Sequence, residues 1–280
     1  MKRARSSRPA EHRPKAVSEV GVSCIIPAYN EGCRIGSVIR AVQKHPWVDE
    51  LIVVNDGSTD DTAAVARGFA GVKLMNLSPN RGKSYAVMKG IEAARNDIIM
   101  LLDADLVGLT HDDLCDLMRP VLSGEADITM SLRHNSLLVY RLIGLDFVSG
   151  ERVFHRRVLG DCSRLAELRS YGLEVFFNRE IIRQRLVLRI VNWRHVICVR
   201  KGDKVGFWLG FKLETLMVLQ ILRTVGLWQV LYQLWKMDVL KRSPSHSARG
   251  SVRSTFGRGT TRGRRRGRGR AASTLPTQNT

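Results

Sequence analysis

The chain has 280 residues, 44% of them hydrophobic, which suffices for one large domain or two small ones with an ordinary core. Its net charge of +19 is uneven, because residues 1–19 carry +4, residues 241–280 carry +11 and the body carries only +4, which excludes a uniformly basic protein. The five cysteines are scattered without a CxxC pair, which argues against a disulfide framework or a zinc site and favours a reducing compartment.

Residues 1–19 contain charged residues but no apolar segment, so we expect a disordered basic leader and not a secretory signal. From residue 20, apolar runs alternate with segments of helical spacing, in which, for example, Ile35, Val38 and Val42 share one face. Strands are predicted at residues 20–29, 50–58, 71–77, 97–105 and 126–132, and helices at residues 31–45, 59–70, 82–96 and 110–124. This alternation predicts an α/β fold, with a mostly parallel sheet covered by helices on both faces.

The alternation fades after residue 131. Residues 147–159 are typical of a strand or loop followed by helical pieces, and residues 171–182 have helical spacing. Residues 185–193 and 195–201 are predicted to form two short strands. We expect these segments to complete one domain that extends over residues 20–204.

Residues 205–240 are strongly apolar, but charged residues interrupt them, and the uncharged stretch 224–235 is shorter than the ~20 residues that a membrane span needs. Trp228, Tyr232 and Trp235 fall on one helical face. Aromatic residues on one face favour an amphipathic helix that lies in the bilayer surface. A C-terminal helix packed on the domain is equally consistent with the pattern.

The C-terminal residues 241–280 contain eleven lysines and arginines and no acidic residue, with an Arg/Gly-rich core, RGRRRGRGR. Such a composition cannot bury a hydrophobic core, so we expect a disordered tail. Tails of this kind bind anionic surfaces, and the sequence does not choose between RNA and acidic lipids.

Polar side chains follow each predicted strand of the first half, where ligands bind in parallel sheets. Glu31 follows the first strand, Asp56 the second, Lys83 the third, and Asp103 and Asp105 the fourth. Two carboxylates one residue apart can share one Mg²⁺ or Mn²⁺ ion, although such a pair alone is more often part of a turn than a metal site. Asp56 can accept hydrogen bonds from a nucleotide or belong to a helix cap. Lys83 can meet a phosphate at a helix start or be merely solvated.

Four segments in this order are more specific than any one of them. CIIPAYNE, IVVNDGSTDDT, NRGKSYAVMKGI and IMLLDAD resemble the family 2 glycosyltransferases, which have the nucleotide-sugar-binding A fold. The resemblance covers residues 20–131 and continues more weakly through SGERVF and YGLEVFFN, which look like the acceptor region of the dolichyl- or polyprenyl-phosphate branch. It implies a nucleotide-sugar half at residues 20–131 and an acceptor half at residues 132–204.

The resemblance also implies roles for individual residues on the donor side. Pro27, Tyr29 and Glu31 would line the nucleotide pocket, and Asp56 would contact the base. Lys83 would lie near the ribose or the phosphates. The donor would be a UDP- or GDP-sugar.

A metal site is implied as well. Asp103 and Asp105 would hold Mg²⁺ or Mn²⁺ on the diphosphate, where the ion neutralises the charge that develops on the leaving group. His195 would be a third ligand, as a histidine is in some relatives, or else a structural histidine between apolar residues. The patterns typical of processive synthases are absent from the sequence, so a polymerising enzyme is not expected.

The acceptor decides which further residues matter. A hydroxyl acceptor needs a general base, and Glu174 is the candidate. A phosphate acceptor is already ionised, and Arg152, Arg156 and Arg157 could then bind a lipid phosphate. The alternative for the last two is a basic surface helix.

These observations predict a metal-dependent, inverting glycosyltransferase. The expected acceptor is a polyprenyl phosphate at the cytoplasmic membrane face, with the protein attached peripherally. A soluble or glycan hydroxyl acceptor is the first alternative. A nucleotidyltransferase is less favoured, because the loop after the first strand lacks the expected basic, glycine-rich character. Nucleic acid is expected as a partner only through the Arg/Gly tail.

Overall fold

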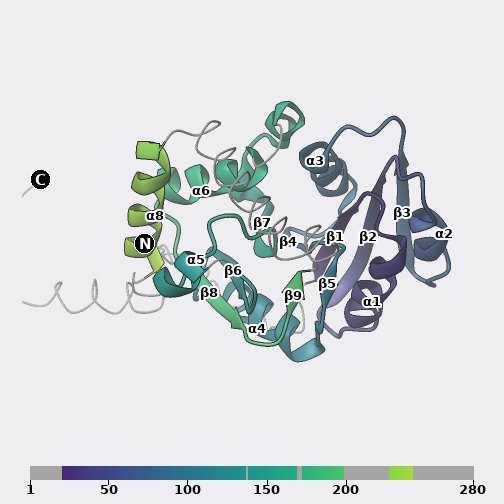
Figure 1. The fold of residues 1–280 in the computed structure, drawn as a ribbon, viewed down its shortest axis with the longest axis horizontal. Helices are drawn as coiled ribbons and strands as arrows, with labels where there is room; N and C mark the ends of the chain where they lie inside the picture. Colours follow the sequence, from purple (N-terminus) through teal and green to yellow (C-terminus); the bar gives the residue numbers. More distant parts are fainter. Residues whose placement is uncertain (1–20, 137, 169–171, 199–226, 242–280) are drawn as a thin grey trace, which may run out of the picture.

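The computed structural model describes residues 21–136, 138–168, 172–198 and 227–241 (Figure 1). The predictions for the basic leader, for the first part of the apolar segment and for the Arg/Gly tail lie outside these residues. They stay predictions.

A seven-stranded sheet forms the centre of the molecule (Figure 1). In spatial order its strands are β3 (Val72–Leu77), β2 (Val48–Asp56), β1 (Val22–Ala28), β4 (Ile98–Leu101), β7 (Arg152–His155), β6 (Ile128–Arg133) and β8 (Leu188–Trp193). The first four run parallel, β7 is antiparallel to both of its neighbours, and β8 is parallel to β6. The predicted mostly parallel α/β fold is confirmed.

A second, two-stranded sheet pairs β5 (Leu106–Val107) with β9 (Ile197–Cys198) in antiparallel orientation. The sequence pattern predicts a strand at residues 195–201, of which the described part ends at Cys198 and pairs over Ile197 and Cys198, and it gives no sign of β5. The small sheet matters because β5 begins directly after Asp105.

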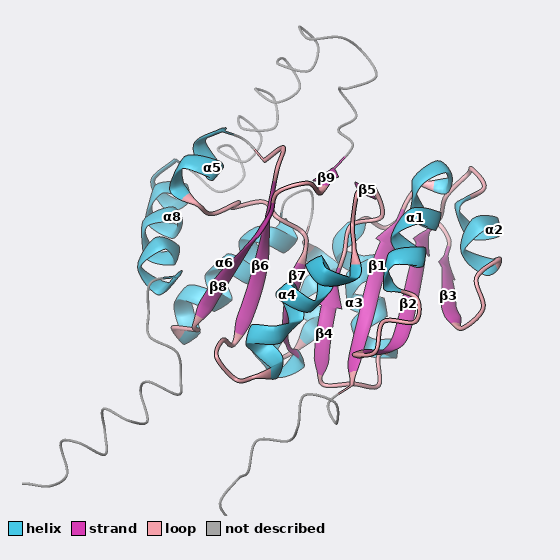
Figure 2. Cartoon of the chain, turned by 90° about the horizontal axis from the view of Figure 1, so that it is seen from below, coloured by secondary structure: helices cyan, strands magenta, loops and turns pink. Residues whose placement is uncertain are grey.

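Helices cover both faces of the main sheet (Figure 2). They are α1 (Gly32–Val42), α2 (Thr62–Arg67), α3 (Lys83–Ala93), α4 (His111–Leu122), α5 (Leu138–Ile143), α6 (Gly172–Gln184) and α8 (Leu227–Lys241), with short 3₁₀ helices η2 (Arg156–Leu159) and η3 (Cys162–Glu167). Residues of α1, α2 and α4 share one hydrophobic core, and residues of α3 and α6 share the other.

Strand β1 explains why the sequence shows a continuous apolar run. Ile25 packs into the core beneath α3 and α6, whereas its neighbours Cys24 and Ile26 pack into the core beneath α1 and α4. Successive side chains of a strand point to opposite faces, so a strand buried on both sides needs apolar residues at every position. Pro27 lies beyond the last residue of β1 that pairs with β4, where its missing N–H removes no hydrogen bond from that pairing.

Within the described chain, no helix combines the length and apolar character needed to cross a bilayer. Of the apolar segment 205–240, the described part is α8, which contacts α6 and β8. The expectation that a C-terminal helix packs on the domain therefore holds for this part.

Gly90 brings α3 close to the sheet. A Cβ atom at Gly90 would lie 2.4 Å from Cγ2 of Ile25 and 3.3 Å from Cγ2 of Val54. We predict that Gly90→Ala lowers the free energy of unfolding by about 1–3 kcal/mol, because overpacking moves α3 off the sheet. Urea unfolding followed by circular dichroism measures the change.

The matched control is Gly36→Ala in α1, where the nearest atom to a new Cβ, Cγ1 of Val65, is 3.5 Å away. That substitution removes a glycine from a helix without a clash, so it should be neutral or stabilising by up to about 1 kcal/mol. Equal stability of the two variants would contradict the packing argument.

Candidate functional site

The carboxyl ends of the parallel strands meet at one edge of the sheet, and Lys83 joins the groups that lie there. Its Nζ is 2.7 Å from Oδ1 of Asp103, which follows β4, and 3.1 Å from Oε1 of Glu174 in the first turn of α6. Burial acts to lower the pKa of Lys83, but the attraction of the two carboxylates outweighs it and raises the pKa above its ordinary value. One ammonium group thus links the two halves of the domain.

Gly150 leaves the space that this contact needs. A Cβ atom at this position would lie 2.5 Å from Oδ1 of Asp103 and 2.7 Å from Nζ of Lys83. Real Cβ atoms do not approach so closely, so a side chain here would displace the Asp103 carboxylate or the Lys83 ammonium group from its present position. Gly150 belongs to the SGERVF segment, whose part in the site is therefore steric as well as polar.

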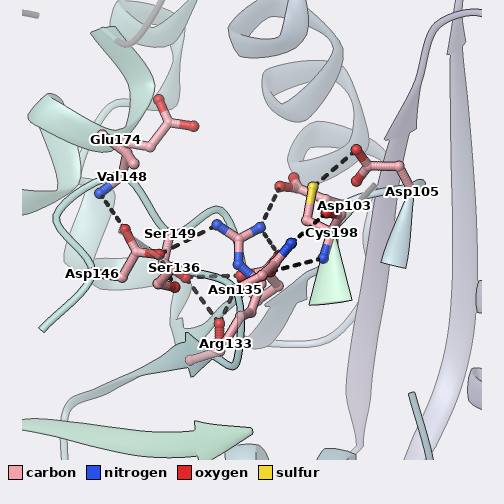
Figure 3. Close-up of polar contacts among 12 residues, drawn as sticks. Asp103, Asp105, Arg133, Asn135, Ser136, Asp146, Val148, Ser149, Glu174 and Cys198 are labelled. Carbon is pink, nitrogen blue, oxygen red and sulfur yellow. Dashed lines mark hydrogen bonds and ion pairs between the residues drawn. The ribbon is translucent and has the colours of Figure 1, made fainter. Parts of the chain in front are cut away.

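Arg133, at the end of β6, supplies a second cation that the sequence pattern does not single out. Its guanidinium contacts Glu151 at 3.1 Å and Asp146 at 3.3 Å, and it lies 4.0 Å from Asp103 (Figure 3). Both of its closer partners are buried, and the hydroxyl groups of three serines donate to them; these are Ser131, Ser136 and Ser149. This network holds the guanidinium beside Asp103, where it adds positive charge.

The two aspartates of the DAD segment lie in different electrostatic surroundings. Burial works to raise the pKa of Asp103, but Lys83 and Arg133 lower it below its ordinary value. The pKa of Asp105 is instead raised to about 6, by burial and by the like charge of Asp103. Within the described residues Asp105 forms no ion pair, and its Oδ2 accepts a hydrogen bond from the thiol of Cys198 at 3.0 Å (Figure 3).

Cys198 reaches the site because β9 pairs with β5, directly after the DAD segment. Asn135 fixes the backbone of Cys198 by donating to its carbonyl oxygen and accepting from its N–H. Burial and the neighbouring Asp105 raise the pKa of this thiol. No pattern in the sequence connects residues 105 and 198, so only the fold reveals this contact.

Glu174 is buried, and only one of its oxygens is satisfied. Lys83 binds Oε1, while Oε2 is inaccessible to solvent and has no hydrogen-bond partner in the part of the chain that the structure describes. A buried carboxylate oxygen without a donor is costly, and such groups are often found at functional sites. The structure thus brings the predicted base candidate next to the DAD segment.

Arg152 is close to this site, but its guanidinium faces inward. It donates to Oδ1 of Asn178 at 3.2 Å and to the carbonyl oxygen of Ser149, and it lies 5.1 Å from the ring centroid of Phe177. Only 1% of Arg152 is exposed, and burial lowers its pKa to about 10. The prediction that it binds a lipid phosphate stays a prediction, and in this arrangement its guanidinium already has hydrogen-bond partners inside the protein.

Arg156 and Arg157 are at the other edge of the sheet. Because β7 runs antiparallel to β4, His155 pairs with Ile98 at the start of β4. Arg156 then donates to the carbonyl oxygens of Ala94 and Asn96, and Arg157 is exposed beside it. The prediction that these two arginines bind an acceptor phosphate stays a prediction, and strand β7 places them at the edge of the sheet opposite to the DAD segment.

His195 is likewise held elsewhere. Its Nε2 lies 3.0 Å from Oδ2 of Asp113, whose backbone N–H and carboxylate form the capping box of α4 with Thr110. Among the described residues, no three His, Cys, Asp or Glu side chains are arranged to hold a metal ion. The role of His195 as a third ligand stays a prediction, and in this structure its Nε2 is instead beside Asp113.

The predicted nucleotide-binding residues occupy the same edge, over β1 and β2. Both oxygens of Asp56 accept hydrogen bonds, from the backbone N–H groups of Arg81 at 2.9 Å and Gly82 at 2.7 Å. This fixes the loop that precedes Lys83.

On β1, Pro27 is buried inside the strand, and Tyr29 just beyond it is 46% exposed. Glu31 lies at the start of α1 and accepts from Nε of Arg34 at 2.6 Å. Of these three residues, Tyr29 and Glu31 have side chains beyond the strand end, where a ligand could reach them.

The carboxylates fit a divalent cation in their chemistry. Mg²⁺ and Mn²⁺ prefer oxygen ligands, and Mg²⁺ is usually bound by one or two carboxylates together with substrate phosphates, so a three-residue cage is not required. Burial and the nearby charge of Asp103 raise the pKa of Asp105, and no cation of the described residues forms an ion pair with Asp105 itself. A cation held by Asp103 and Asp105 would relieve that repulsion.

Residues 23–156, which include β1 to β4, the DAD segment and Gly150, match the family described as Glycosyl transferase family 2. The chain contains a glycosyl transferase family 2 domain. The predicted family is thereby confirmed, and so is the likeness to its polyprenyl-phosphate branch, since the relatives below include dolichyl- and dodecaprenyl-phosphate enzymes.

Several curated family 2 relatives resemble part of the chain. A dolichyl-phosphate beta-glucosyltransferase of Trichomonas vaginalis is 37% identical over 31% of this chain and 30% of its own length. A dodecaprenyl-phosphate galacturonate synthase of Rhizobium johnstonii is 30% identical over 42% of this chain and 38% of its own length. The chain thus matches less than half the length of each of these relatives.

A solved structure supports the same fold over a longer range. Glucosyl-3-phosphoglycerate synthase of Mycobacterium tuberculosis, in complex with Mn²⁺, uridine diphosphate and glucosyl-3-phosphoglycerate, has a TM-score of 0.55 and 26% identity. The likeness covers 70% of this chain and 81% of that chain. It therefore extends beyond the family 2 match into the second half of the domain.

Asp105→Asn is predicted to stabilise the metal-free protein at neutral pH. The pKa of Asp105 is about 6 in the folded chain against an ordinary 3.8, so the folded state binds this proton more tightly. As the pH rises from about 4 to 6, ionisation of Asp105 lowers the free energy of unfolding of the wild type by about 3 kcal/mol, and above pH 6 this effect stays constant. An asparagine at this position does not ionise, so the variant avoids that loss. Urea unfolding with EDTA at a series of pH values measures it.

Asp112→Asn, at an exposed position in the first turn of α4, is the matched control. Its stability difference from the wild type should not grow across that pH window. An Asp105→Asn protein as stable as the wild type at both ends of the window would contradict the uncompensated charge at Asp105.

Proposed function

We propose that the protein transfers a sugar from a UDP- or GDP-sugar to an acceptor, with inversion at the anomeric carbon and with Mg²⁺ or Mn²⁺ as the cofactor. The observation that carries this proposal is the meeting of Asp103, Lys83 and Glu174 at the carboxyl edge of a family 2 domain. The relatives that resemble the chain are named as sugar transferases, and the solved structure was obtained with Mn²⁺ and uridine diphosphate.

The donor would occupy the half formed by residues 20–131. Tyr29 and Glu31 would line the nucleotide pocket beside Pro27, and Asp56 would contact the base while it keeps the loop of Arg81 in place. A bound metal, held by Asp103 and Asp105, would stabilise the charge on the leaving diphosphate.

The two cationic side chains at the site, Lys83 and Arg133, would also stabilise the leaving group. Lys83 and Arg133 lie beside Asp103, so they would also face negative charge that builds on the leaving diphosphate. Charges held in a preorganised, partly buried site stabilise such a transition state without rearrangement. The ion pairs of Arg133 with Glu151 and Asp146 keep its guanidinium in position for this task.

The acceptor would enter the half formed by residues 132–204, and a polyprenyl phosphate at the cytoplasmic membrane face is the acceptor that we propose. Two of the relatives carry dolichyl phosphate or dodecaprenyl phosphate in their names. An ionised phosphate attacks without a general base. Its charge would be met by Lys83 and Arg133, since Arg152, Arg156 and Arg157 are engaged elsewhere or lie at the other edge.

A hydroxyl acceptor is the second candidate, and Glu174 favours it. Its Oε2 is buried without a donor in the described residues, so it could take the proton of an attacking hydroxyl. The structural neighbour named above was solved with glucosyl-3-phosphoglycerate, which is not a lipid.

Turnover tests the proposal directly. Full-length protein is incubated with Mn²⁺ or Mg²⁺ and a panel of nucleotide sugars, with and without a polyprenyl phosphate, and nucleoside diphosphate release is measured. We expect release that depends on both metal and acceptor, and its loss in Asp105→Ala but not in Asp112→Ala. Full activity of Asp105→Ala would remove the metal site, and neither turnover nor binding with any nucleotide sugar would overturn the proposed function.

Glu174→Gln separates the two acceptor classes. With a hydroxyl acceptor the substitution should lower kcat by about 10²–10⁴, the usual contribution of a general base, whereas with a phosphate acceptor kcat should change far less. Glu180→Gln on the same helix, where Glu180 pairs with Arg183, is the control for effects on folding. A large loss of kcat with polyprenyl phosphate would rule out the base-free mechanism.

A further inference from the structure

Helix α8 has two distinct faces. Gln233 and Met237 are fully buried, and Met237 belongs to the core that α3 and α6 share. On the other face four large apolar side chains are exposed at positions i, i+4, i+7 and i+11; they are Trp228 at 83%, Tyr232 at 46%, Trp235 at 60% and Val239 at 49%. Packing on the domain therefore accounts for only half of this helix.

The exposed face, formed by Trp228, Tyr232, Trp235 and Val239, is an aromatic stripe that carries a cation. The Nζ of Lys236 lies 4.7 Å from the ring centroid of Trp235 and 5.9 Å from that of Tyr232. Tryptophan and tyrosine rings favour the boundary between headgroups and acyl chains, and a lysine beside them extends its ammonium group toward the headgroups. Contiguous exposed apolar surface of this kind marks an interaction site.

Charge indicates the partner. The only acidic residue of α8, Asp238, is paired with Lys241 at 2.9 Å, and the sequence from residue 241 onward carries eleven basic residues and no acidic one. Basic residues near an anionic bilayer each contribute about 1 kcal/mol to binding. Apolar aromatics together with unopposed positive charge match an anionic lipid surface better than a neutral one.

We infer that the aromatic stripe of α8 docks the protein on an anionic lipid bilayer. The helix lies in the interface plane, with the stripe inserted among the headgroups and the packed face holding it to the domain. Because α8 packs on α6, which carries Glu174, docking brings the acceptor half to the lipid. The inference rests on the proposed function in so far as a lipid-borne acceptor is what docking would supply.

Vesicle flotation tests the inference with the full-length chain and no nucleotide sugar. Wild-type protein should float with vesicles of phosphatidylcholine and phosphatidylglycerol, and much less with phosphatidylcholine alone. Trp228→Ala combined with Trp235→Ala should lower the partition coefficient roughly tenfold or more, because two large side chains no longer leave water. Gln229→Ala, an exposed polar position on the same helix, should float like the wild type.

The opposite results are equally clear. Wild-type protein that fails to float, or a double tryptophan variant that floats as well as the wild type while its far-ultraviolet circular dichroism is unchanged, would overturn the inference. A competition with an RNA oligonucleotide gives a further test. If RNA displaces the wild type and the double tryptophan variant from vesicles to the same extent, the basic tail is the whole binding surface and the inference is overturned.

The flotation and turnover experiments test the docking surface and the proposed function independently of each other. If the protein floats by its aromatic stripe but releases no nucleoside diphosphate from any donor, the proposed function fails and the docking surface stands. If a detergent-dispersed acceptor is turned over while flotation is absent, the docking surface fails and the transferase stands.

Discussion

The contact of Lys83 with Asp103 and Glu174 holds the site together. Asp103 follows a strand of the donor half, Glu174 lies in the first turn of a helix of the acceptor half, and the ammonium group of Lys83 pairs with both of them. Removing charges from water is expensive, and such groups are retained only when they are mutually neutralised and hydrogen-bonded. Gly150 leaves room for this approach, because a Cβ atom there would lie within 3 Å of both Asp103 and Lys83.

Around this contact, the two aspartates of the DAD segment have different electrostatic surroundings. Asp103 is surrounded by cations and holds its charge, whereas Asp105 is left beside like charges and a thiol. Folding alone gains nothing from that asymmetry. A site that must receive a metal and a diphosphate does gain, because the ligand supplies the missing positive charge. Arg133, fixed by buried carboxylates, completes the set on the side from which we propose that the acceptor enters.

The parallel half of the fold and several residues of the site could be predicted from the sequence, whereas contacts that depend on long-range strand pairing could not. Periodicity located β1 to β4 and the helices between them, because both faces of the sheet are buried, and strand ends then placed Asp56, Lys83 and Asp103 at one edge. The direction of β7 is a long-range pairing that no local pattern encodes, so the sequence does not show at which edge of the sheet Arg156 lies. Cys198 lies near Asp105 only because the short strands β5 and β9 pair. His195 contacts Asp113, a residue of the capping box of α4, and neither contact follows from a local pattern in the sequence.

Strand β7 has one more effect on the domain. Since it runs against β4, the chain reaches His155 at the amino edge of the parallel strands and must travel back over the height of the sheet before α6 begins. Glu174 thus arrives by a long crossover, and not by the short turn that delivers Asp103. Contacts along this crossover tie it to the donor half, since Arg156 donates to the carbonyl oxygens of Ala94 and Asn96 and η3 packs on α3. The distance between the two carboxylates is therefore set by this helix packing as well as by the ammonium group between them.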